Sequence, residues 1–147
     1  MKAGQFLTST YLLDEDYFAQ AVILLTECNE QGAMGFIINR PFARRFNELE
    51  EFKHSIAFPL YEGGPVDQEH LFFVHRRPDL IPGGEPAGEG LYIGGDFSTA
   101  VRLLNNKTLT EKDIRLFIGY CGWDREGLEA EIAEGSWTLS DSGQLLS

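Results

Sequence analysis

The segment GYCGWDREGLEAEIAEGSW, residues 119–137, sets two aromatic residues and a cysteine among glycines and then runs directly into an acidic stretch. Gly119 and Gly122 let a strand bend where larger side chains would collide. Tyr120 and Trp123 supply large apolar surfaces that can be buried across such a bend. The segment therefore predicts a β-strand that turns sharply into a helix, and packing alone explains its composition.

The second half of this segment carries the signals of a short helix. Asp124 stands at the N-cap position, and Leu128 and Ile132 have the i, i+4 spacing of an inward-facing pair. Gly135 is the residue expected just after a helix C-terminus, because glycine adopts the left-handed conformation without strain. Trp137 then begins a last short strand or an extended arm.

Upstream, the chain contains a predicted β-hairpin. Residues 20–39, QAVILLTECNEQGAMGFIIN, hold two apolar runs, and Asn29 and Gly32 between them would supply the positive φ angles of a tight reversal. Both runs are almost continuously apolar, which predicts a sheet covered on both faces near its centre. The Asn-Arg-Pro segment at 39–41 should end the second strand, since proline has no amide hydrogen to donate.

The remaining elements alternate between helical and strand patterns. The apolar spacing of residues 46–53 predicts a short amphipathic helix, and Asp96 predicts the N-cap of another helix. The Gly/Pro-rich residues 78–90 are few enough to form a loop within the domain. Branched and aromatic residues predict further strands at 71–75, 91–93 and 114–120.

Composition and charge bound the class of protein. The 147 residues, 43% of them hydrophobic, suffice for one domain with a core, which we expect to span residues 1–147. The net charge of −11 opposes binding to phosphate backbones, so we expect no direct nucleic-acid binding. No signal-peptide pattern begins the chain, and no apolar run approaches the roughly 20 residues that cross a bilayer. We therefore expect a cytoplasmic protein without a membrane segment.

Three segments occur in an order that matches a known family. They are GAMGFIINRP at 32–41, YEGGPV at 61–66 and GYCGW at 119–123, and together with the N-terminal region they span nearly the whole chain. On these segments the chain resembles the YqgE/AlgH family of uncharacterised bacterial proteins. The resemblance implies a single α+β domain with a mixed, curved, partly barrel-like β-sheet flanked by helices. It implies no established biochemical activity, although the AlgH name is associated with transcriptional control.

Two positions depart from the usual pattern of that family. Cys28 stands where a histidine is expected, and Glu126-Gly127 stand where Gly-Gln is expected before a Leu-Glu pair. A role that rests on that histidine or glutamine therefore does not transfer to this chain. The residues that do match are mostly turn formers, which is typical of a fold signature.

Cys121 is the best candidate for a catalytic nucleophile, since it lies among glycines just before a helix N-terminus that could lower its pKa. The alternative, for Cys121 and for Cys28, is a small buried thiol in the core. His54, His70 and His75 are not spaced to serve as a base for Cys121, and His75 fits a hydrogen-bonded strand position. No cluster has metal-ligand spacing, so we expect neither a metal nor another cofactor.

Arg40 also has two interpretations. Held between Asn39 and Pro41 at a strand end, it could bind an anion or a ligand carboxylate. It could equally form an internal ion pair that fixes the loop. Glu126 and Glu129 on the last helix are more simply explained as a solvated acidic face.

Three hypotheses for function follow. The first is a non-enzymatic binding or regulatory domain with a groove for an unknown protein or small-molecule partner. It is favoured because the sequence shows no acid, base and nucleophile that would converge on one catalytic site. The second is an enzyme that uses a cysteine or a carboxylate, and the third is a transcriptional regulator, as the AlgH name suggests. We expect the three family segments to meet as the rim of one groove. Its candidate residues are Asn39, Arg40, Pro41, Gly63, Gly64, Pro65, Gly119, Tyr120, Cys121, Gly122 and Trp123.

Overall fold

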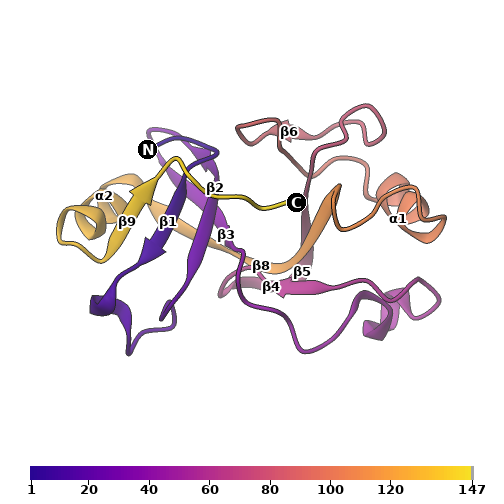
Figure 1. The fold of residues 1–147 in the computed structure, drawn as a ribbon, viewed down its shortest axis with the longest axis horizontal. Helices are drawn as coiled ribbons and strands as arrows, with labels where there is room; N and C mark the ends of the chain where they lie inside the picture. The colour runs from indigo at the N-terminus through magenta and orange to yellow at the C-terminus, as the bar shows by residue number, and fades with distance from the viewer. Residues whose placement is uncertain (147) are drawn as a thin grey trace.

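Strand β8 (Ile114–Asp124) organises the fold because it belongs to both halves of the sheet (Figure 1). In the structure, a computed structural model that describes residues 1–146, its first part pairs with β5 (Val66–His75) antiparallel and with β4 (Leu60–Glu62) parallel. Its last four residues pair antiparallel with β3 (Gly32–Ile37). Apart from β4, the strands of residues 1–146 lie in the order β6 (Glu85–Pro86), β7 (Tyr92–Ile93), β5, β8, β3, β2 (Val22–Cys28), β1 (Phe6–Ser9) and β9 (Trp137–Ser140).

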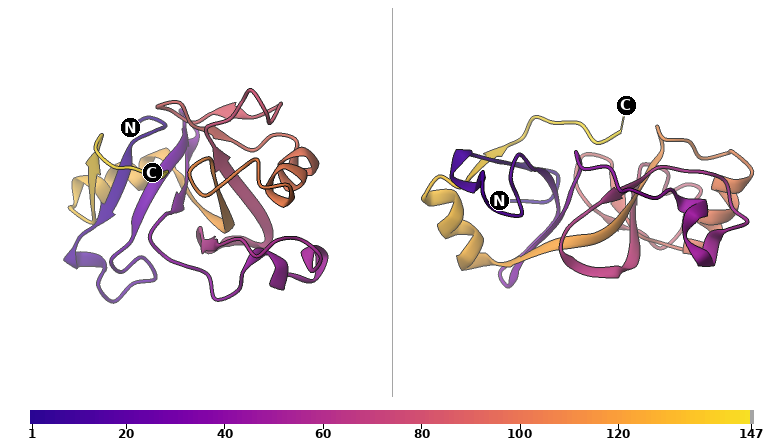
Figure 2. Two further views of the ribbon diagram at one scale, coloured as in Figure 1. Left: turned by 45° about the vertical axis from the view of Figure 1, so that its right-hand side comes forward. Right: turned by 90° about the horizontal axis from the view of Figure 1, so that it is seen from below.

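The bend in β8 falls at Gly119, which has a φ of +75°. Seen from below in Figure 2, β8 runs as one long curved strand from one half of the molecule to the other. Gly122, which the sequence also suggested as a bending residue, does not have a positive φ, and a Cβ atom there would contact only the Tyr120 ring at 3.4 Å. The curled mixed sheet with its helices confirms the expected α+β, partly barrel-like fold.

The predicted hairpin is β2 and β3, which pair antiparallel. Its turn forms differently from the expectation, because neither Asn29 nor Gly32 has a positive φ. Instead, the Asn29 side-chain oxygen accepts hydrogen bonds from the backbone N–H groups of Gln31 (2.8 Å) and Gly32 (3.1 Å). A side-chain turn of this kind replaces the backbone conformation that the sequence pattern suggested.

Both faces of the hairpin are buried, as its continuous apolar runs predict. Ile23 and Leu25 point into a cluster with Trp137 and with Leu128 of helix α2 (Arg125–Ala133). Leu24 points to the opposite face, into a cluster that includes Leu145 and Leu146. The C-terminal residues reach this cluster by running from β9 back across to the other half of the molecule (Figure 1).

Two of the three predicted helices form as α-helices, and their ends use the expected residues. Helix α1 (Phe97–Asn105) follows Asp96, whose carboxylate accepts a hydrogen bond from the Thr99 hydroxyl rather than from a backbone N–H. Asp124 caps α2 by accepting from the Gly127 N–H. Gly135 (φ +92°) and the residue after it donate to the last turn of α2, which is the Schellman arrangement.

The helix predicted at residues 46–53 is wrong. Two 3₁₀ turns form instead, η2 (Phe46–Glu48) and η3 (Glu50–Phe52), because Leu49 between them is extended with a ψ of 134°. The Phe46 N–H donates to the Phe58 carbonyl, so a tertiary contact shapes this segment.

Strand β5 also begins five residues earlier than predicted, at Val66. Its pairing with β8 is irregular up to Leu71, and Asp67 in that stretch has a φ of +53°. A further 3₁₀ turn, η1 (Tyr11–Leu13), precedes β2.

Candidate functional site

The three family segments meet where β8 crosses from one half of the sheet to the other. The Gly63 N–H donates to the Ile118 carbonyl of β8, and the Gly63 carbonyl accepts from the Ile37 N–H of β3, both at 2.8 Å. The Glu62 N–H donates to the Arg40 carbonyl at 2.9 Å. The segments at 39–41, 61–66 and 119–123, which we call the junction, are therefore held side by side by backbone hydrogen bonds.

Close backbone contact explains the glycine pair of the junction. A Cβ atom on Gly63 would lie 2.4 Å from the Gly119 carbonyl oxygen. A Cβ atom on Gly64 would lie 2.2 Å from the carbonyl carbon and oxygen of Tyr120. Any larger residue would force the strands apart, so these glycines are needed for the fold. Pro65, which follows them, is exposed.

The Arg40 side chain is occupied by groups of its own chain. Its guanidinium donates to the Glu62 carboxylate at 3.3 Å and to the Tyr17 carbonyl at 3.0 Å, and it lies 4.9 Å from the centre of the Tyr17 ring. The Tyr17 hydroxyl also donates to Glu62. Burial is the main cause that raises the pKa of Tyr17, and the Glu62 carboxylate raises it further. The Asn39 amide bonds the backbones of Val22 and Gln20. Arg40 thus forms the internal ion pair that was one of its two interpretations.

The Cys121 thiol is buried, with 1% of the residue exposed, and it donates to the Gly63 carbonyl at 3.3 Å. Burial raises the pKa of Cys121 to about 12. Cys28 is half-buried, and burial raises its pKa as well. Since a thiolate is the reactive form of cysteine, neither residue has the lowered pKa of a catalytic nucleophile.

The outer side of the junction is a shallow hollow. Tyr120, Gly122 and Trp123 line it together with the turn of the β2–β3 hairpin, and its volume is about 300 Å³. Asn39, Arg40 and the Gly63-Gly64-Pro65 corner do not line this hollow. The structure thus brings the three family segments together, but of their candidate residues only Tyr120, Gly122 and Trp123 line this hollow.

A larger cavity, of about 560 Å³, lies between the 42–52 segment, the first half of β5 and the start of α1, and we call it the acid-rimmed cavity. Sequence reasoning missed it, because its walls come from segments far apart in the chain. Its one sequence signal was the apolar face of residues 46–53. The floor consists of Phe42, Leu49, Phe52, Leu71, Phe97 and Ile118. The rim consists of Arg44, Glu50, Glu51, Gln68, Glu69 and His70.

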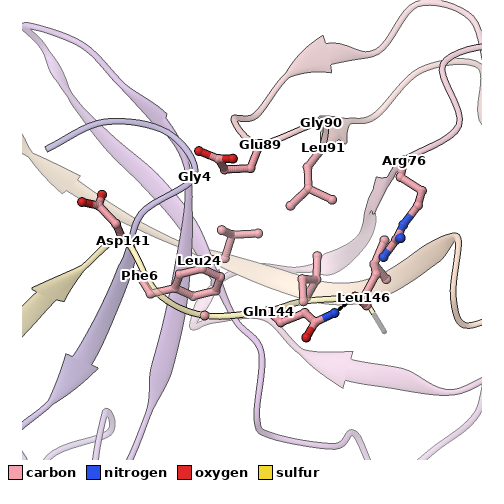
Figure 3. Close-up of a pocket in the computed structure, with 12 residues that line it drawn as sticks. Gly4, Phe6, Leu24, Arg76, Glu89, Gly90, Leu91, Asp141, Gln144 and Leu146 are labelled. Carbon is pink, nitrogen blue, oxygen red and sulfur yellow. Dashed lines mark hydrogen bonds between the residues drawn. The ribbon is translucent and has the colours of Figure 1, made fainter.

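A second cavity, of about 420 Å³, lies between the two halves of the molecule beside the C-terminal residues (Figure 3). Arg76 stands at one side of it, and Glu89 and Asp141 stand toward the other. Leu145 and Leu146 line it and are 5% and 2% exposed. The chain's C-terminal residues therefore form part of the wall of this cavity.

His75 is fully buried next to β7 and has a structural role. Its Nε2 lies 3.0 Å from the Gly94 carbonyl, and its Nδ1 accepts from the Arg77 N–H at 3.1 Å. These two bonds require the neutral ring with its proton on Nε2, and burial lowers the pKa of His75. Across residues 1–146, no three His, Cys, Asp or Glu residues are grouped so that they could hold a metal ion. None of the helices in the same range is long and apolar enough to cross a membrane.

The fold is shared with solved bacterial proteins. The solution structure of AlgH from Pseudomonas aeruginosa matches this chain with a TM-score of 0.76 and 31% sequence identity, over 95% of this chain and 76% of that one. The crystal structure of DIP2367 from Corynebacterium diphtheriae matches with a TM-score of 0.77 over 97% of this chain and 77% of that one. At 21% identity it shows the fold alone. The class is thus an α+β domain built on a curled mixed sheet.

Sequence relatives define the family. A UPF0301 protein of Chlorobium luteolum is 41% identical over 142 residues, which cover 97% of this chain and 75% of that protein. One from Bacteroides thetaiotaomicron is 38% identical over 138 residues, which cover 93% and 70%. The AlgH-like family, DUF179, matches residues 6–146. The chain belongs to this AlgH-like family, which confirms the resemblance found from the three segments.

Proposed function

We propose that the chain is a non-enzymatic binding domain and that the acid-rimmed cavity holds its ligand. The observation that carries this proposal is the cavity itself. Its volume of about 560 Å³ falls within the roughly 300–1,000 Å³ of small-molecule sites, and such sites share its apolar floor. The cavity beside the C-terminal residues supports a ligand less well, because it is smaller, at about 420 Å³, and Phe6 is the one aromatic residue that lines it.

The state of the reactive side chains favours binding over catalysis. Cys121 is a neutral thiol bonded to the Gly63 carbonyl, and Arg40 is held by Glu62 and by backbone carbonyls. His75 is buried, and both of its ring nitrogens have backbone partners. The hypothesis of an enzyme that uses a cysteine or a carboxylate is therefore the second choice.

We infer that any part in transcriptional control, as the AlgH name implies, proceeds through a bound ligand or protein in the cytoplasm. The net charge of −11 opposes direct contact with DNA. The groove expected at the junction stays a second candidate site. Its support is the hollow lined by Tyr120, Gly122 and Trp123.

A neutral probe tests the proposed site. Phenylpropanol has an apolar body and no charge, and its binding can be followed by NMR shifts of the backbone amides. We expect saturable shifts at the floor and rim of the acid-rimmed cavity. Leu49→Ala should weaken the binding several-fold, because Leu49 lines the cavity.

Leu80→Ala is the matched control. Leu80 is a half-buried leucine that packs on the same core cluster as Leu49, and it does not line the cavity. This variant should bind the probe like the parent. Shifts confined to other parts of the protein, or equal weakening by both variants, would show that the ligand site lies elsewhere.

A further inference from the structure

We propose that the acid-rimmed cavity selects small organic cations, meaning ligands with an amine on an apolar body. This inference rests on the proposed function and adds the chemical class of the ligand. Two independent features carry it, the charge of the rim and the aromatic rings of the floor.

The rim has more negative than positive charge available to a ligand. Glu50, Glu51 and Glu69 line it, and no basic side chain of residues 1–146 lies within 4.0 Å of the Glu51 or Glu69 carboxylate. Lys53 pairs with Glu50 at 3.2 Å, so this acid contributes less. Glu51 and Glu69 thus leave two carboxylates without an ion-pair partner at the mouth. After Asp67, both help to raise the pKa of the neighbouring His70.

Of the two basic side chains on the rim, His70 has a carboxylate partner, and Arg44 has no carboxylate of residues 1–146 within 4.0 Å. His70 pairs with Asp67, whose carboxylate raises the pKa of His70 and whose charge offsets that of the protonated ring. The Arg44 guanidinium lies 5.8 Å from the centre of the Phe42 ring. An incoming anion would therefore meet two free carboxylates and only one cation, whereas an incoming amine would be attracted.

The floor offers aromatic surface as well as apolar area. Phe42, Phe52 and Phe97 all line the cavity. The Phe42 ring already carries the Arg44 guanidinium, so Phe52 and Phe97 are the rings left for a ligand, and they meet edge to face with centres 5.6 Å apart. Aromatic faces attract cations through the quadrupole of the ring, and this attraction grows when water is excluded. Charge at the mouth and aromatic rings on the floor therefore favour the same kind of ligand.

The distribution of apolar surface points to a small molecule rather than to a protein partner. A protein interface needs roughly 800 Å² of buried surface on each partner, so an apolar patch should continue beyond the cavity. The large hydrophobic side chains of residues 1–146 that are most exposed, Tyr11, Leu12, Tyr17 and Val66, do not line it. The apolar surface here is concave and bounded by charged residues.

Three probes with the same phenylpropyl body and different charges test the inference. We expect phenylpropylamine to bind about tenfold tighter than phenylpropionate at low ionic strength, with neutral phenylpropanol between them. The preference should shrink in about 0.5 M salt, which screens the rim. NMR titration gives each affinity and shows whether the cavity residues respond.

Charge-neutral variants assign the preference to the rim. The double variant Glu51→Gln/Glu69→Gln should remove most of the difference between amine and carboxylate and leave phenylpropanol unchanged. Glu126→Gln/Glu129→Gln makes the same change of net charge on α2, away from the cavity, and should bind like the parent.

The outcomes separate this inference from the proposed function. If phenylpropanol binds in the cavity and the amine and the carboxylate bind equally, the cation preference is wrong and the binding site stands. If none of the three probes shifts the cavity residues, the proposed function fails with it. A preference that persists in Glu51→Gln/Glu69→Gln would also overturn the inference.

Discussion

At the scale of single residues, burial sets the chemistry of the titratable groups. Cys121 and His75 are 1% and 0% exposed. Burial raises the pKa of Cys121 and lowers the pKa of His75, so it favours the neutral form of each side chain. Both neutral side chains hold backbone groups in place, the Gly63 carbonyl for Cys121 and the Gly94 carbonyl for His75. These two buried polar side chains thus satisfy backbone groups.

Cys121 should resist alkylation in the folded protein. With a pKa of about 12, its thiolate population at neutral pH is about 1,000-fold or more below that of an ordinary cysteine, and burial blocks access as well. We expect iodoacetamide to modify the half-buried Cys28 first and Cys121 only after unfolding. Mass spectrometry of Cys28→Ser protein isolates Cys121. Rapid native alkylation of this variant would restore the hypothesis of a cysteine enzyme.

His75 should make the protein less stable as the pH falls. Its pKa in the folded state is below the usual 6.5, so the unfolded state binds the proton more tightly, and stability is lost as the pH drops below about 6.5. Urea unfolding between about pH 5 and pH 8 should show this slope, and His75→Gln should flatten it.

His70 provides the control of opposite sign. Asp67 raises the pKa of His70, so its contribution is present below pH 6.5 and is lost as the pH rises. His70→Gln should therefore leave the His75 slope in place or steepen it. Equal flattening by both variants would be evidence against a special role for His75.

At the scale of elements, β8 depends on one glycine for its bend. Gly119→Ala requires a positive φ in a residue with a side chain, and its Cβ would lie 2.4 Å from the Gly64 carbonyl oxygen. We expect a loss of about 2–4 kcal/mol in the free energy of unfolding. Gly122→Ala in the same strand has room for its Cβ and should stay within about 0.5 kcal/mol of the parent. Similar losses for both in denaturant unfolding would contradict this assignment.

The α2–β9 end of the molecule should depend on Trp137 more than on Trp123. Trp137 is 2% exposed and its indole N–H donates to Glu131 of α2 at 3.0 Å, whereas Trp123 is only half-buried beside it. Trp137→Ala should cost about 3–5 kcal/mol, and Trp123→Ala about 1–3 kcal/mol. Chemical denaturation of both variants measures the difference. The reverse order would mean that Trp123 is the main anchor of this end.

At the scale of the whole molecule, the two halves of the sheet are joined by β8 and by the C-terminal residues. Leu145 and Leu146 share a buried cluster with Phe6 of β1 and with Phe117 of β8. These two C-terminal leucines thus pack against both halves, and the cavity of Figure 3 lies beside them.

The charge of the whole molecule predicts weak interaction with DNA. With a net charge of −11, we expect duplex binding weaker than about 100 μM at physiological salt, because few phosphate counterions would be released. Fluorescence anisotropy with a labelled duplex at several salt concentrations measures this. Tight binding that weakens steeply with salt would reveal a local basic surface and favour the regulator hypothesis.

The sequence by itself determined the elements whose signals are local. Asp124 and Gly135 mark the two ends of α2, as predicted. The continuous apolar run of β2 is buried on both faces because alternate side chains enter different clusters. Capping and side-chain alternation act between residues a few positions apart, so they can be recognised in the chain alone. The three family segments likewise identified the fold, since backbone atoms lie too close to most of their glycines to leave room for a side chain.

Tertiary structure decided what depends on residues distant in sequence. Leu49 became extended and divided a predicted helix into two turns, because the contact of Phe46 with Phe58 outweighs helical periodicity. Arg40 could be assigned to Glu62 and Tyr17 only once the chain had folded. The acid-rimmed cavity joins residues 42–52, 68–71, 97 and 118, and no local pattern encodes how such segments meet. Each of these features is set by packing between elements, whose geometry is fixed by the whole fold.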